Sequence, residues 1–447
     1  MDLLDKIFAA GVVGCGGAGF PTHVKLKGRF EYLIVNGAEC EPLLRNDRWL
    51  MRNKAGELVE AISAIAGELD IPNAVIALKH HYQEEAAALR QAIDRSGARI
   101  RLHEMESFYP AGDEQTIVYE VTGRVVPPAG LPGDVGAVVD NVATIYAVYQ
   151  ALQDHPFIWK YLTVNGEVEH PVVLKVPVGT SFRTCLELAG GTKSDKFFVV
   201  AGGPMMGRPV PMDQLDKAVV TKTTSGILVL PPEGYHAAHN GLELRHMLNR
   251  ARSACIQCSA CSQLCPRHLL GHPLEPHRIM RKMAVCTDLP ALLEDPVIRN
   301  AQLCCECGVC EVYACPMGLQ PRKINAAIKQ ELGRSGIRYQ RTGDHWTAEP
   351  EREMRKAPSK RVASRVGVAA YDHREITELV CGRPKEVRIP VKMHIGAPAV
   401  PTVAEGDRVT AGMVIARPPE GALGALVHAS ISGTVTSVGE EIAIVEG

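Results

Sequence analysis

Cysteine thiolates at short, regular spacings are the side chains of this chain best suited to chemistry, because thiolates bind metal ions and metal clusters. Ten of the fourteen cysteines lie in one segment, from Cys255 to Cys315. Thiols that only fill a hydrophobic core would be scattered along the sequence. This clustering predicts a metal site in the middle of the chain.

Two runs in this segment have the spacing of iron–sulfur ligands. The first is C-x2-C-x2-C-x3-C-P, and the second is C-x2-C-x2-C-x4-C-P, one residue longer in its last gap. In the bacterial two-cluster pattern the fourth cysteine of each run ligates the cluster of the other run. We therefore predict two [4Fe–4S] clusters. The expected ligands of one are Cys255, Cys258, Cys261 and Cys315, and those of the other are Cys304, Cys307, Cys310 and Cys265.

A structural zinc site is the rival interpretation, since zinc ribbons also use C-x2-C pairs. A third cysteine at the same spacing and the terminal C-P are surplus to a zinc ribbon, so iron–sulfur clusters are favoured. Cys305 and Cys286 fit neither set and are expected to be a bystander and a packing residue. The histidines after the first run are expected to lie at the surface or behind the ligands: His268, His272 and His277.

A glycine-rich loop is the second candidate for chemistry. Residues 14–19 read GCGGAG and satisfy G-x-G-x-x-G, but they follow an amphipathic helix and run into Phe20 and Pro21. A dinucleotide-binding fingerprint should follow a strand and open a helix, so the ordinary interpretation of the motif fails here. Glycines at this density still let backbone N–H groups approach a phosphate or a flat ring.

Four pieces in order give the loop a context: GGAGFPT at 16–22 with Lys25 beyond it, NGAECEP at 36–42, YPAGDE at 109–114 and DNVAT at 140–144. Together they resemble the FMN-binding subunit of respiratory complex I over residues 10–150. The resemblance implies bound FMN, with Phe20 near its ring and the acidic residues Glu39, Glu41 and Glu114 beside the flavin and the nicotinamide. Of these we expect Glu41 and Glu114 to be catalytic. The FMN ligands that it implies are Gly16, Gly17, Gly19, Lys25, Asn36 and Asn141.

This sequence departs from that family where NADH would bind. The aromatic residues expected to stack on adenine are absent from residues 26–28 and 127–130, and Ala38 replaces an aspartate. NADH remains the expected electron donor. FMN is expected because its phosphate needs N–H donors and a cation, which the loop and Lys25 offer.

The elements that must position these residues indicate a multidomain α/β fold. Helical and strand patterns alternate over the first 150 residues, short strands follow to residue 230, and the last 60 residues are rich in strands. A basic stretch at 352–365 is expected to be solvated. The predicted domains are a Rossmann-like FMN and NADH domain at 1–155, an α+β module at 156–235, a helical double-[4Fe–4S] ferredoxin-like domain at 240–335, a linker at 336–385 and a strand-rich domain at 386–447. The α+β module resembles the ubiquitin-like SLBB domain, and the strand-rich domain resembles a β barrel-sandwich hybrid.

This domain order resembles two families, the RnfC subunits of ion-pumping membrane complexes and the cobalamin reductases of propanediol-utilisation microcompartments. The barrel-sandwich segment stands at the C-terminus, from residue 387, which favours the cobalamin reductases. That resemblance implies NADH as donor, cobalamin as substrate and a corrinoid adenosyltransferase as partner, with shell proteins as further partners. An RnfC-like electron-transfer subunit is the alternative.

Composition excludes other classes of function. A formal net charge of −1 gives no electrostatic case for nucleic acid. No apolar run is long enough for a membrane span, and residues 1–10 lack the apolar core of a signal peptide. We therefore expect a cytoplasmic protein, located in the microcompartment lumen, with residues 1–10 as part of the fold.

Overall fold

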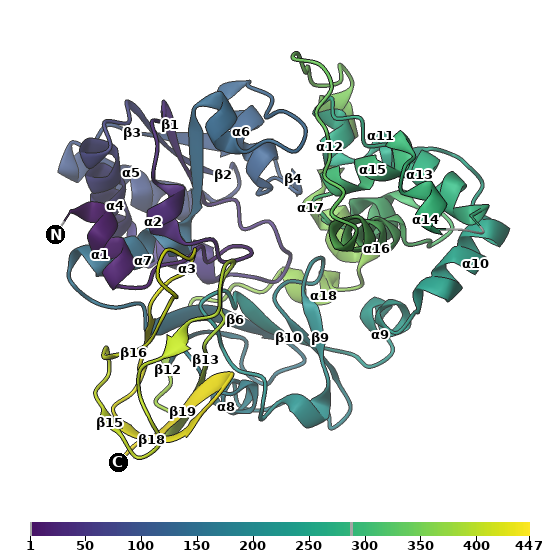
Figure 1. The fold of residues 1–447 in the computed structure, drawn as a ribbon. Helices are drawn as coiled ribbons and strands as arrows, with labels where there is room; N and C mark the ends of the chain where they lie inside the picture. The colour runs from purple at the N-terminus through teal and green to yellow at the C-terminus, as the bar shows by residue number, and fades with distance from the viewer. Residues whose placement is uncertain (1, 287–288) are drawn as a thin grey trace.

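The N-terminal domain is built on a parallel sheet with helices on its faces (Figure 1). The computed structural model describes residues 2–286 and 289–447. The sheet has the order β3-β2-β1-β5, and all of its pairs are parallel. Its strands are β1 (Tyr32–Asn36), β2 (Asn73–Lys79), β3 (Ile100–Met105) and β5 (Ala137–Asn141). Its helices are α1 (Leu3–Ala9), α2 (Thr22–Lys25), α3 (Asn46–Asn53), α4 (Ala55–Glu68), α5 (Gln83–Ser96), α6 (Glu114–Thr122) and α7 (Val142–Leu152).

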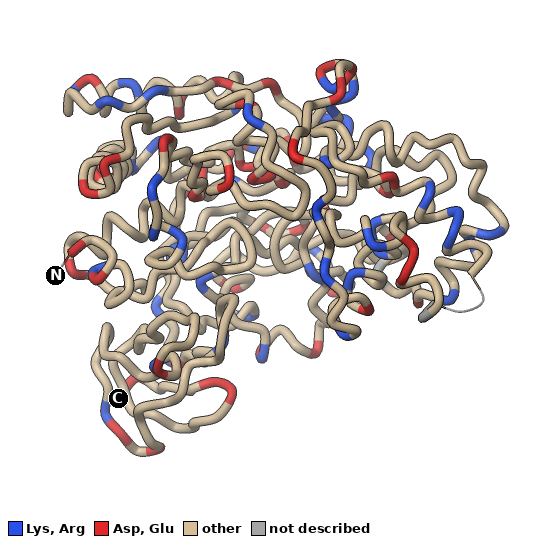
Figure 2. The backbone as a smooth tube through the Cα atoms, turned by 45° about the horizontal axis from the view of Figure 1, so that its top comes forward, with Lys and Arg blue, Asp and Glu red and all other residues tan. Residues whose placement is uncertain are grey.

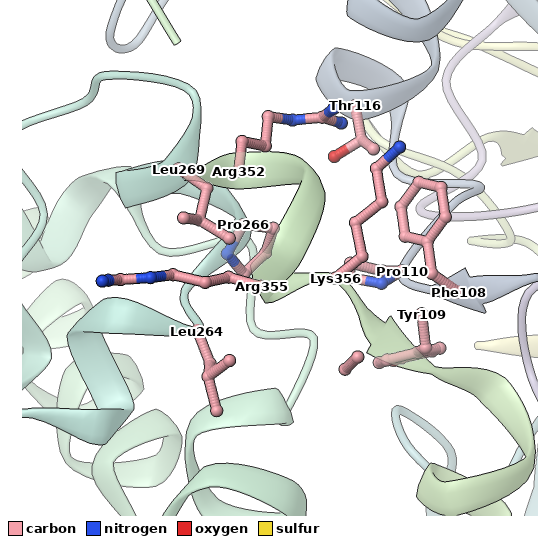
Figure 3. A pocket seen from close by; sticks show the side chains of 11 residues that line it. Phe108, Tyr109, Pro110, Thr116, Leu264, Pro266, Leu269, Arg352, Arg355 and Lys356 are labelled. Atoms are coloured by element: carbon pink, nitrogen blue, oxygen red, sulfur yellow. The ribbon is translucent and has the colours of Figure 1, made fainter. Parts of the chain in front are cut away.

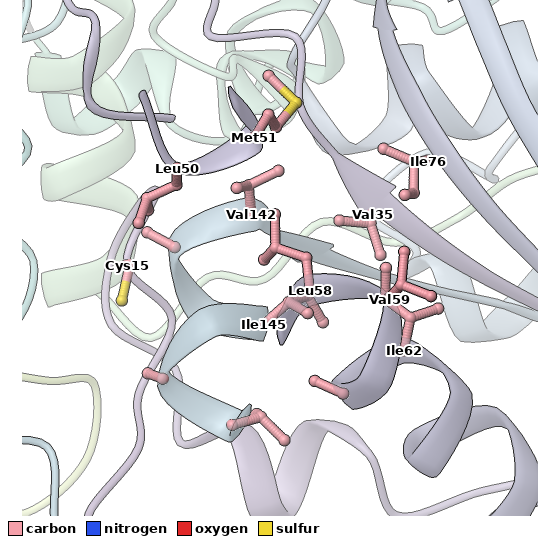
Figure 4. Packing of buried hydrophobic residues seen from close by; sticks show 14 of the residues in the cluster. Cys15, Val35, Leu50, Met51, Leu58, Val59, Ile62, Ile76, Val142 and Ile145 are labelled. Atoms are coloured by element: carbon pink, nitrogen blue, oxygen red, sulfur yellow. The ribbon is translucent and has the colours of Figure 1, made fainter. Parts of the chain in front are cut away.

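Packing of helix stripes against the central strands forms the core of this domain. The apolar stripe of α4, which includes Leu58 and Ile62, is buried and meets Val35 and Ile76 of the sheet (Figure 4). Strands that are apolar on both faces belong in the middle of a parallel sheet. Strands β1 and β5 pair in parallel, so their carboxyl ends lie side by side and Asn36 lies opposite Asn141.

The α+β module that follows is a mixed sheet of order β12-β7-β6-β10-β8-β9. One helix, α8 (Phe182–Leu188), packs on it through Phe182 and Leu186. The strands are β6 (Trp159–Gly166), β7 (Val172–Pro177), β8 (Phe198–Ala201), β9 (Arg208–Val210), β10 (Gly226–Leu230) and β12 (Leu379–Cys381).

The cysteine-rich segment is helical, as the sequence predicts. The core lies between amphipathic helices, of which α10 and α16 bury Met247 and Ile328. The elements that carry or flank the cysteines are α10 (Leu244–Ala254), α11 (Ala260–Gln263), α12 (Pro266–Leu269), α13 (Pro276–Ala284), the π-helical turn η4 (Cys310–Ala314) and α16 (Pro321–Arg334).

The expectation of an irregular linker over 336–385 is wrong for its second half. Strand β11 (Ala357–Pro358) pairs with β4 (Phe108–Tyr109) of the N-terminal domain, and β12 adds a parallel strand beside β7. Two helices lie between them, α17 (Ser359–Arg365) and α18 (Ala369–Asp372). The segment is polar, which favours a linker, but several of its charged side chains form ion pairs with the N-terminal domain. The pairs are Arg341–Asp134, Arg352–Glu120 and Asp372–Arg45.

The C-terminal domain is made of two small antiparallel sheets around a core of Val387, Ile415 and Ile444. The sheets have the orders β13-β19-β18-β15 and β14-β16-β17. Their strands are β13 (Glu386–Pro390), β14 (Val400–Pro401), β15 (Arg408–Val409), β16 (Val414–Arg417), β17 (Val427–His428), β18 (Gly433–Val438) and β19 (Glu441–Val445). The Ile395 N–H donates to the Gly19 carbonyl at 3.3 Å, so this domain packs on the glycine loop.

Across the described residues, none of the helices combines the length and the apolar character needed to cross a membrane.

Candidate flavin and iron–sulfur sites

The glycine loop leaves open space at one position only. A Cβ on Gly16 would lie 3.0 Å from the Asn141 side chain, whereas a Cβ on Gly17 would meet nothing within 4 Å. Gly19 has φ +75°, and a Cβ there would lie 2.9 Å from Thr223 Cγ2 of the SLBB module. Packing therefore requires glycine at positions 16 and 19. Gly17 is exposed and faces open space, called here the open cradle, which a flat ligand could occupy.

Phe20 ends the loop half-buried, and its carbonyl accepts the Gly14 N–H at 2.9 Å.

Lys25, at the end of α2, lies between two carboxylates. Its Nζ is 2.7 Å from Glu114 Oε1 and 4.0 Å from Asp140 Oδ1. Asp140 is 3 % exposed, and its Oδ2 has no hydrogen-bond partner. Burial raises the pKa of Asp140 to about 6, opposed by Lys25. A half-buried cation beside an unpaired, buried acid oxygen fits a site for a polar ligand.

The two asparagines expected to hold the flavin also hold the loops of the domain. Asn36 Nδ2 donates to the Gly112 carbonyl at 2.9 Å, and its Oδ1 accepts the Ala38 N–H. Asn141 Oδ1 caps α7 by accepting the Ala143 N–H at 2.9 Å. These bonds fix both amides at the carboxyl edge of the sheet.

Glu39 is buried behind the same edge. Its carboxylate accepts the backbone N–H of Asp47 at 2.8 Å, and the Asp47 side chain in turn accepts from Asn141 Nδ2 at 2.6 Å. Burial, followed by the charge of Asp47, raises the pKa of Glu39 to about 7. Glu39 therefore belongs to a buried network that reaches Asn141.

Glu41 lies in different surroundings from Glu114. Its carboxylate accepts the backbone N–H groups of Met205 and Met206, at 2.8 and 2.9 Å, in a loop of the SLBB module. A Cβ on Gly203 would lie 2.3 Å from Glu41 Cβ, so the two domains touch closely here. Burial raises the pKa of Glu41 to about 7. The structure thus brings together Lys25 and Glu114, and places Glu41 at a domain interface.

The cysteines gather in two groups that mix the two runs. One cavity is lined by four of them: Cys255, Cys258, Cys261 and Cys315. Burial and the three other thiols of this group raise the pKa of Cys261 to about 12. The second group is buried, at 7–9 % exposure, and consists of Cys265, Cys304, Cys307 and Cys310. Burial above all, with Glu311 and neighbouring thiols of this group, raises the pKa of Cys310.

Both runs fold into the same pair of turns. Residues on either side of the middle cysteine have left-handed backbone: Gln257 and Ser259 in the first run, at φ 54° and 59°, and Glu306 and Gly308 in the second, at φ 58° and 83°. A non-glycine residue in this region costs about 1–2 kcal/mol. Such strain at matching positions is typical of loops that wrap a bound group.

Backbone N–H groups also point at sulfur. The Glu306 N–H donates to Cys304 Sγ at 3.4 Å, and the Leu319 N–H donates to Cys315 Sγ at 3.3 Å. Hydrogen bonds to cysteine sulfur tune the potential of an iron–sulfur cluster.

The extra residue in the last gap of the second run has a local explanation. Residues Cys310–Ala314 form a π-helical turn, whereas the first run forms the ordinary α-helical turn α11 at the equivalent place. A π turn accommodates one inserted residue within a helix. The second run can therefore present its cysteines as the first does, although its sequence is longer.

The remaining candidates act as packing residues or connectors. Cys305 contacts Cys307 and Arg267, while His272 Nε2 bonds the Val126 carbonyl at 2.9 Å. His277 Nδ1 lies 2.8 Å from Ser262 Oγ. No group of three or more His, Cys, Asp or Glu side chains in the described part of the chain converges closely enough to hold a single metal ion.

A bridge loop, residues 108–114, touches both sites. The buried Tyr109 hydroxyl donates to the Cys307 carbonyl at 2.7 Å, and Asp113 pairs with Arg267 at 2.8 Å. The same loop offers the Gly112 carbonyl to Asn36 and Glu114 to Lys25. The bridge loop therefore joins the carboxyl edge of the FMN-like sheet to the buried cysteine group.

A short segment, residues 347–358, packs against this junction through two of its cations. Arg352 and Lys356 both pair with Glu120 of α6, the latter at 3.1 Å, and Lys356 lies 4.6 Å from the Phe108 ring centre. Figure 3 shows these cations beside a cavity lined by both domains. The expectation that the basic stretch is solvated is wrong for Arg352 and Lys356, since both are largely buried in ion pairs.

Four protein-family models match the chain in the order of its domains. The matches are the Nuo51 FMN-binding domain at residues 7–150, the SLBB domain at 161–209, the 4Fe–4S dicluster domain at 254–320 and the RnfC barrel sandwich hybrid domain at 365–446.

Full-length relatives identify the family. Cobalamin reductase PduS of Salmonella typhimurium is 41% identical over 450 residues, which cover 100% of this chain and 97% of that protein. The chain belongs to the cobalamin reductase family. The Citrobacter freundii cobalamin reductase PduS is 40% identical over 449 residues, or 99% of this chain and 96% of that protein. This chain is therefore an oxidoreductase with FMN-binding and iron–sulfur domains.

Similarity to another family is partial. One subunit of the proton-translocating ferredoxin:NAD(+) oxidoreductase complex of Clostridium ljungdahlii is 34% identical to this chain over 274 residues. That match covers 60% of this chain and 56% of the Clostridium protein.

Proposed function

We propose that this protein passes electrons from NADH through FMN and two [4Fe–4S] clusters to a corrinoid. The substrates are cob(III)alamin and cob(II)alamin, and the reduced product supports regeneration of adenosylcobalamin during propanediol utilisation. The observation that carries the proposal is the bridge loop, because Tyr109 and Glu114 connect the buried cysteine group to the FMN-like edge. The full-length likeness to cobalamin reductases PduS supports the choice of substrate.

The residues that would hold FMN are those of the open cradle. Backbone N–H groups around Gly17 and the cation of Lys25 suit a phosphate, and Asn36 and Asn141 present amides at the edge where a flavin ring would lie. Bound FMN supplies the conversion of a two-electron donor into single electrons, and the clusters supply one-electron conduction. Glu114 orients Lys25 and faces the donor, and Glu41 fixes the adjoining SLBB loop.

The route inside the protein has a direction. The buried group with Cys307 adjoins the bridge loop, so it takes electrons first. The group with Cys258 opens to a surface cavity, so electrons leave from it.

Partners and location follow from the same proposal. A corrinoid adenosyltransferase would use the reduced corrinoid, and the protein would work in the lumen of a microcompartment, with shell proteins nearby. The alternative, an RnfC-like subunit of a membrane complex, is supported by a match over 60% of the chain, against 100% for the cobalamin reductase.

Anaerobic reconstitution with iron, sulfide and FMN tests the proposal. We expect a brown protein whose flavin absorbance bleaches with NADH and which then reduces cob(III)alamin, followed by its absorbance. Colourless protein that contains zinc would contradict the cluster assignment. Bleaching and cluster reduction without corrinoid reduction would favour the RnfC-like alternative.

A further inference from the structure

The two cysteine groups differ in their access to solvent. Cys304 and Cys307 of the buried group are only 9 % and 8 % exposed, whereas Cys258 is exposed and lines a cavity. Electron transfer between proteins requires a close approach of the partner to the donor group. The cavity beside Cys258 is therefore the place where a partner can come closest.

The rim of this cavity is apolar. Ile256, between two cysteines of the first run, is 61% exposed, and Met317, two residues after Cys315, is 40% exposed. Both side chains line the cavity. Large apolar side chains exposed next to each other commonly mark a contact surface.

Positive charge surrounds the apolar rim. Residues 244–286 contain seven Arg and Lys residues and one acid, Glu275. Two of the cations pair with acids outside this range, Arg267 with Asp113 and Lys282 with Asp295, which leaves a net +4 in a chain whose net charge is −1. Helix α10 ends one residue before Cys255, and α13 contributes His277 and Met280 to the cavity. Figure 2 shows the cationic residues gathered over the cysteine-rich domain, with few acids among them.

Individual cations lie close to the rim. Arg250 Nη2 donates to the Gly318 carbonyl at 3.1 Å, next to Met317. Arg278 and Arg281 are exposed on α13, each directly after a cavity-lining residue, His277 and Met280, and Arg278 pairs with Glu275 at 2.7 Å. An apolar centre ringed by charge of one sign is the arrangement of a steered, transient interface.

We propose that this exit face, made of Ile256, Met317, Arg250, Arg278 and Arg281, docks a protein with an acidic surface that accepts one electron at a time. The inference rests on the proposed function, because it needs the Cys258 group to hold a cluster. In each transfer the protein loses one electron and the carrier gains it; no group is transferred, and any proton that the reduced carrier takes up comes from water. The corrinoid would then receive its electrons through this acidic protein, or while bound to it, and not free in solution, because the net +4 acts on a partner of opposite net charge.

The test compares two small electron carriers of opposite charge, the acidic flavodoxin and the basic cytochrome c. The reconstituted protein is reduced with dithionite, freed of excess reductant and mixed with each oxidised carrier in a stopped-flow instrument. Reduction by dithionite makes the test independent of NADH and FMN. Binding of oxidised flavodoxin to oxidised protein is measured by calorimetry, as a readout without electron transfer.

We expect the flavodoxin rate to fall with added salt and to be about tenfold lower at low salt in the double variant Arg278→Glu, Arg281→Glu. The same variant should bind flavodoxin more weakly and should react faster with cytochrome c. The matched control is Arg95→Glu, Arg99→Glu, which reverses two exposed charges on the N-terminal domain.

The outcomes are distinct. Equal flavodoxin rates and affinities in the two double variants would overturn the exit face, provided that both retain their iron. Absence of a cluster signal after dithionite would instead contradict the proposed function, and flavodoxin binding would still test the surface by itself.

Discussion

Each cysteine of the two groups has a distinct expected effect at the scale of the residue. Replacing Cys258 or Cys307 by Ala should remove about half of the iron in each case, because each residue belongs to a different group of four. Iron and sulfide analysis of anaerobically reconstituted protein measures this. Cys286→Ala is the matched control and should keep all of the iron. Unchanged iron in Cys258→Ala or Cys307→Ala would refute the assignment.

Lys25 is expected to dominate FMN retention. Lys25→Gln removes the cation that lies between Glu114 and Asp140, and a lost charge-assisted bond to a phosphate is worth about 1.5–3 kcal/mol. FMN affinity, measured by flavin fluorescence, should fall about tenfold or more. Lys27→Gln, at an exposed position two residues on, should bind FMN as the original protein does. Equal affinities in the two variants would exclude Lys25 from the site.

Not every residue of the site could be found from sequence. The cysteine groups follow from spacing alone, but Asp140 was passed over although it immediately precedes Asn141 in one of the motifs. Its significance comes from burial and from the 4.0 Å approach to Lys25, which is 115 residues away in sequence. Glu41, one of the residues expected beside the flavin, accepts the Met205 N–H of another domain, a contact that the sequence did not predict.

The glycine loop makes a prediction at the scale of the element. Gly17→Ala should leave the free energy of unfolding within about 0.5 kcal/mol of the original, since a Cβ there meets no protein atom within 4 Å. It should nevertheless weaken FMN binding, because the methyl group enters the open cradle. Urea unfolding and a flavin titration measure the two effects. A large loss of stability, or unchanged FMN binding, would contradict the role given to Gly17.

Secondary structure was predictable where periodicity was strong. The alternation of helices and strands predicted over the first 150 residues is confirmed, with β1, α4 and β2 following one another along the chain. The π-helical turn Cys310–Ala314 was visible only as an extra residue, because spacing does not tell an insertion in a loop from one in a helix. Strand β11 could not be predicted from the local sequence because its partner, β4, lies about 250 residues earlier in the chain.

At the scale of the whole molecule, a buried lysine that belongs to none of the sequence motifs joins the first domain to the last. Lys222 is 2 % exposed and donates to the Gly11 carbonyl of the first domain at 2.7 Å and to the Leu426 carbonyl of the last at 2.9 Å. Burial lowers the pKa of Lys222 to about 7. The facing His428 has its pKa lowered by burial to about 3, so it stays neutral near pH 7.

This burial makes stability depend on pH. Between about pH 7 and the ordinary lysine pKa of 10.5, the unfolded chain binds a proton at Lys222 that the folded protein lacks. The free energy of unfolding should therefore rise with pH, by at most about 1.4 kcal/mol per pH unit from this group. Lys222→Met should show a flatter pH dependence in anaerobic urea unfolding. Parallel curves for the two proteins would show that Lys222 is charged in the folded state.

The arrangement of domains supports the proposed route, in which electrons would pass from the flavin to a cluster in the buried Cys307 group and then to one in the exposed Cys258 group. No sequence pattern predicts this order, because it depends on the contact of Tyr109 with Cys307 across 198 residues.

Freeze-quench electron paramagnetic resonance after mixing with NADH tests this order most directly. In Cys258→Ala the remaining cluster should be reduced as fast as in the original protein. In Cys307→Ala the flavin should still bleach, but the remaining cluster should be reduced far more slowly. Fast cluster reduction in Cys307→Ala together with slow reduction in Cys258→Ala would reverse the order and contradict the account.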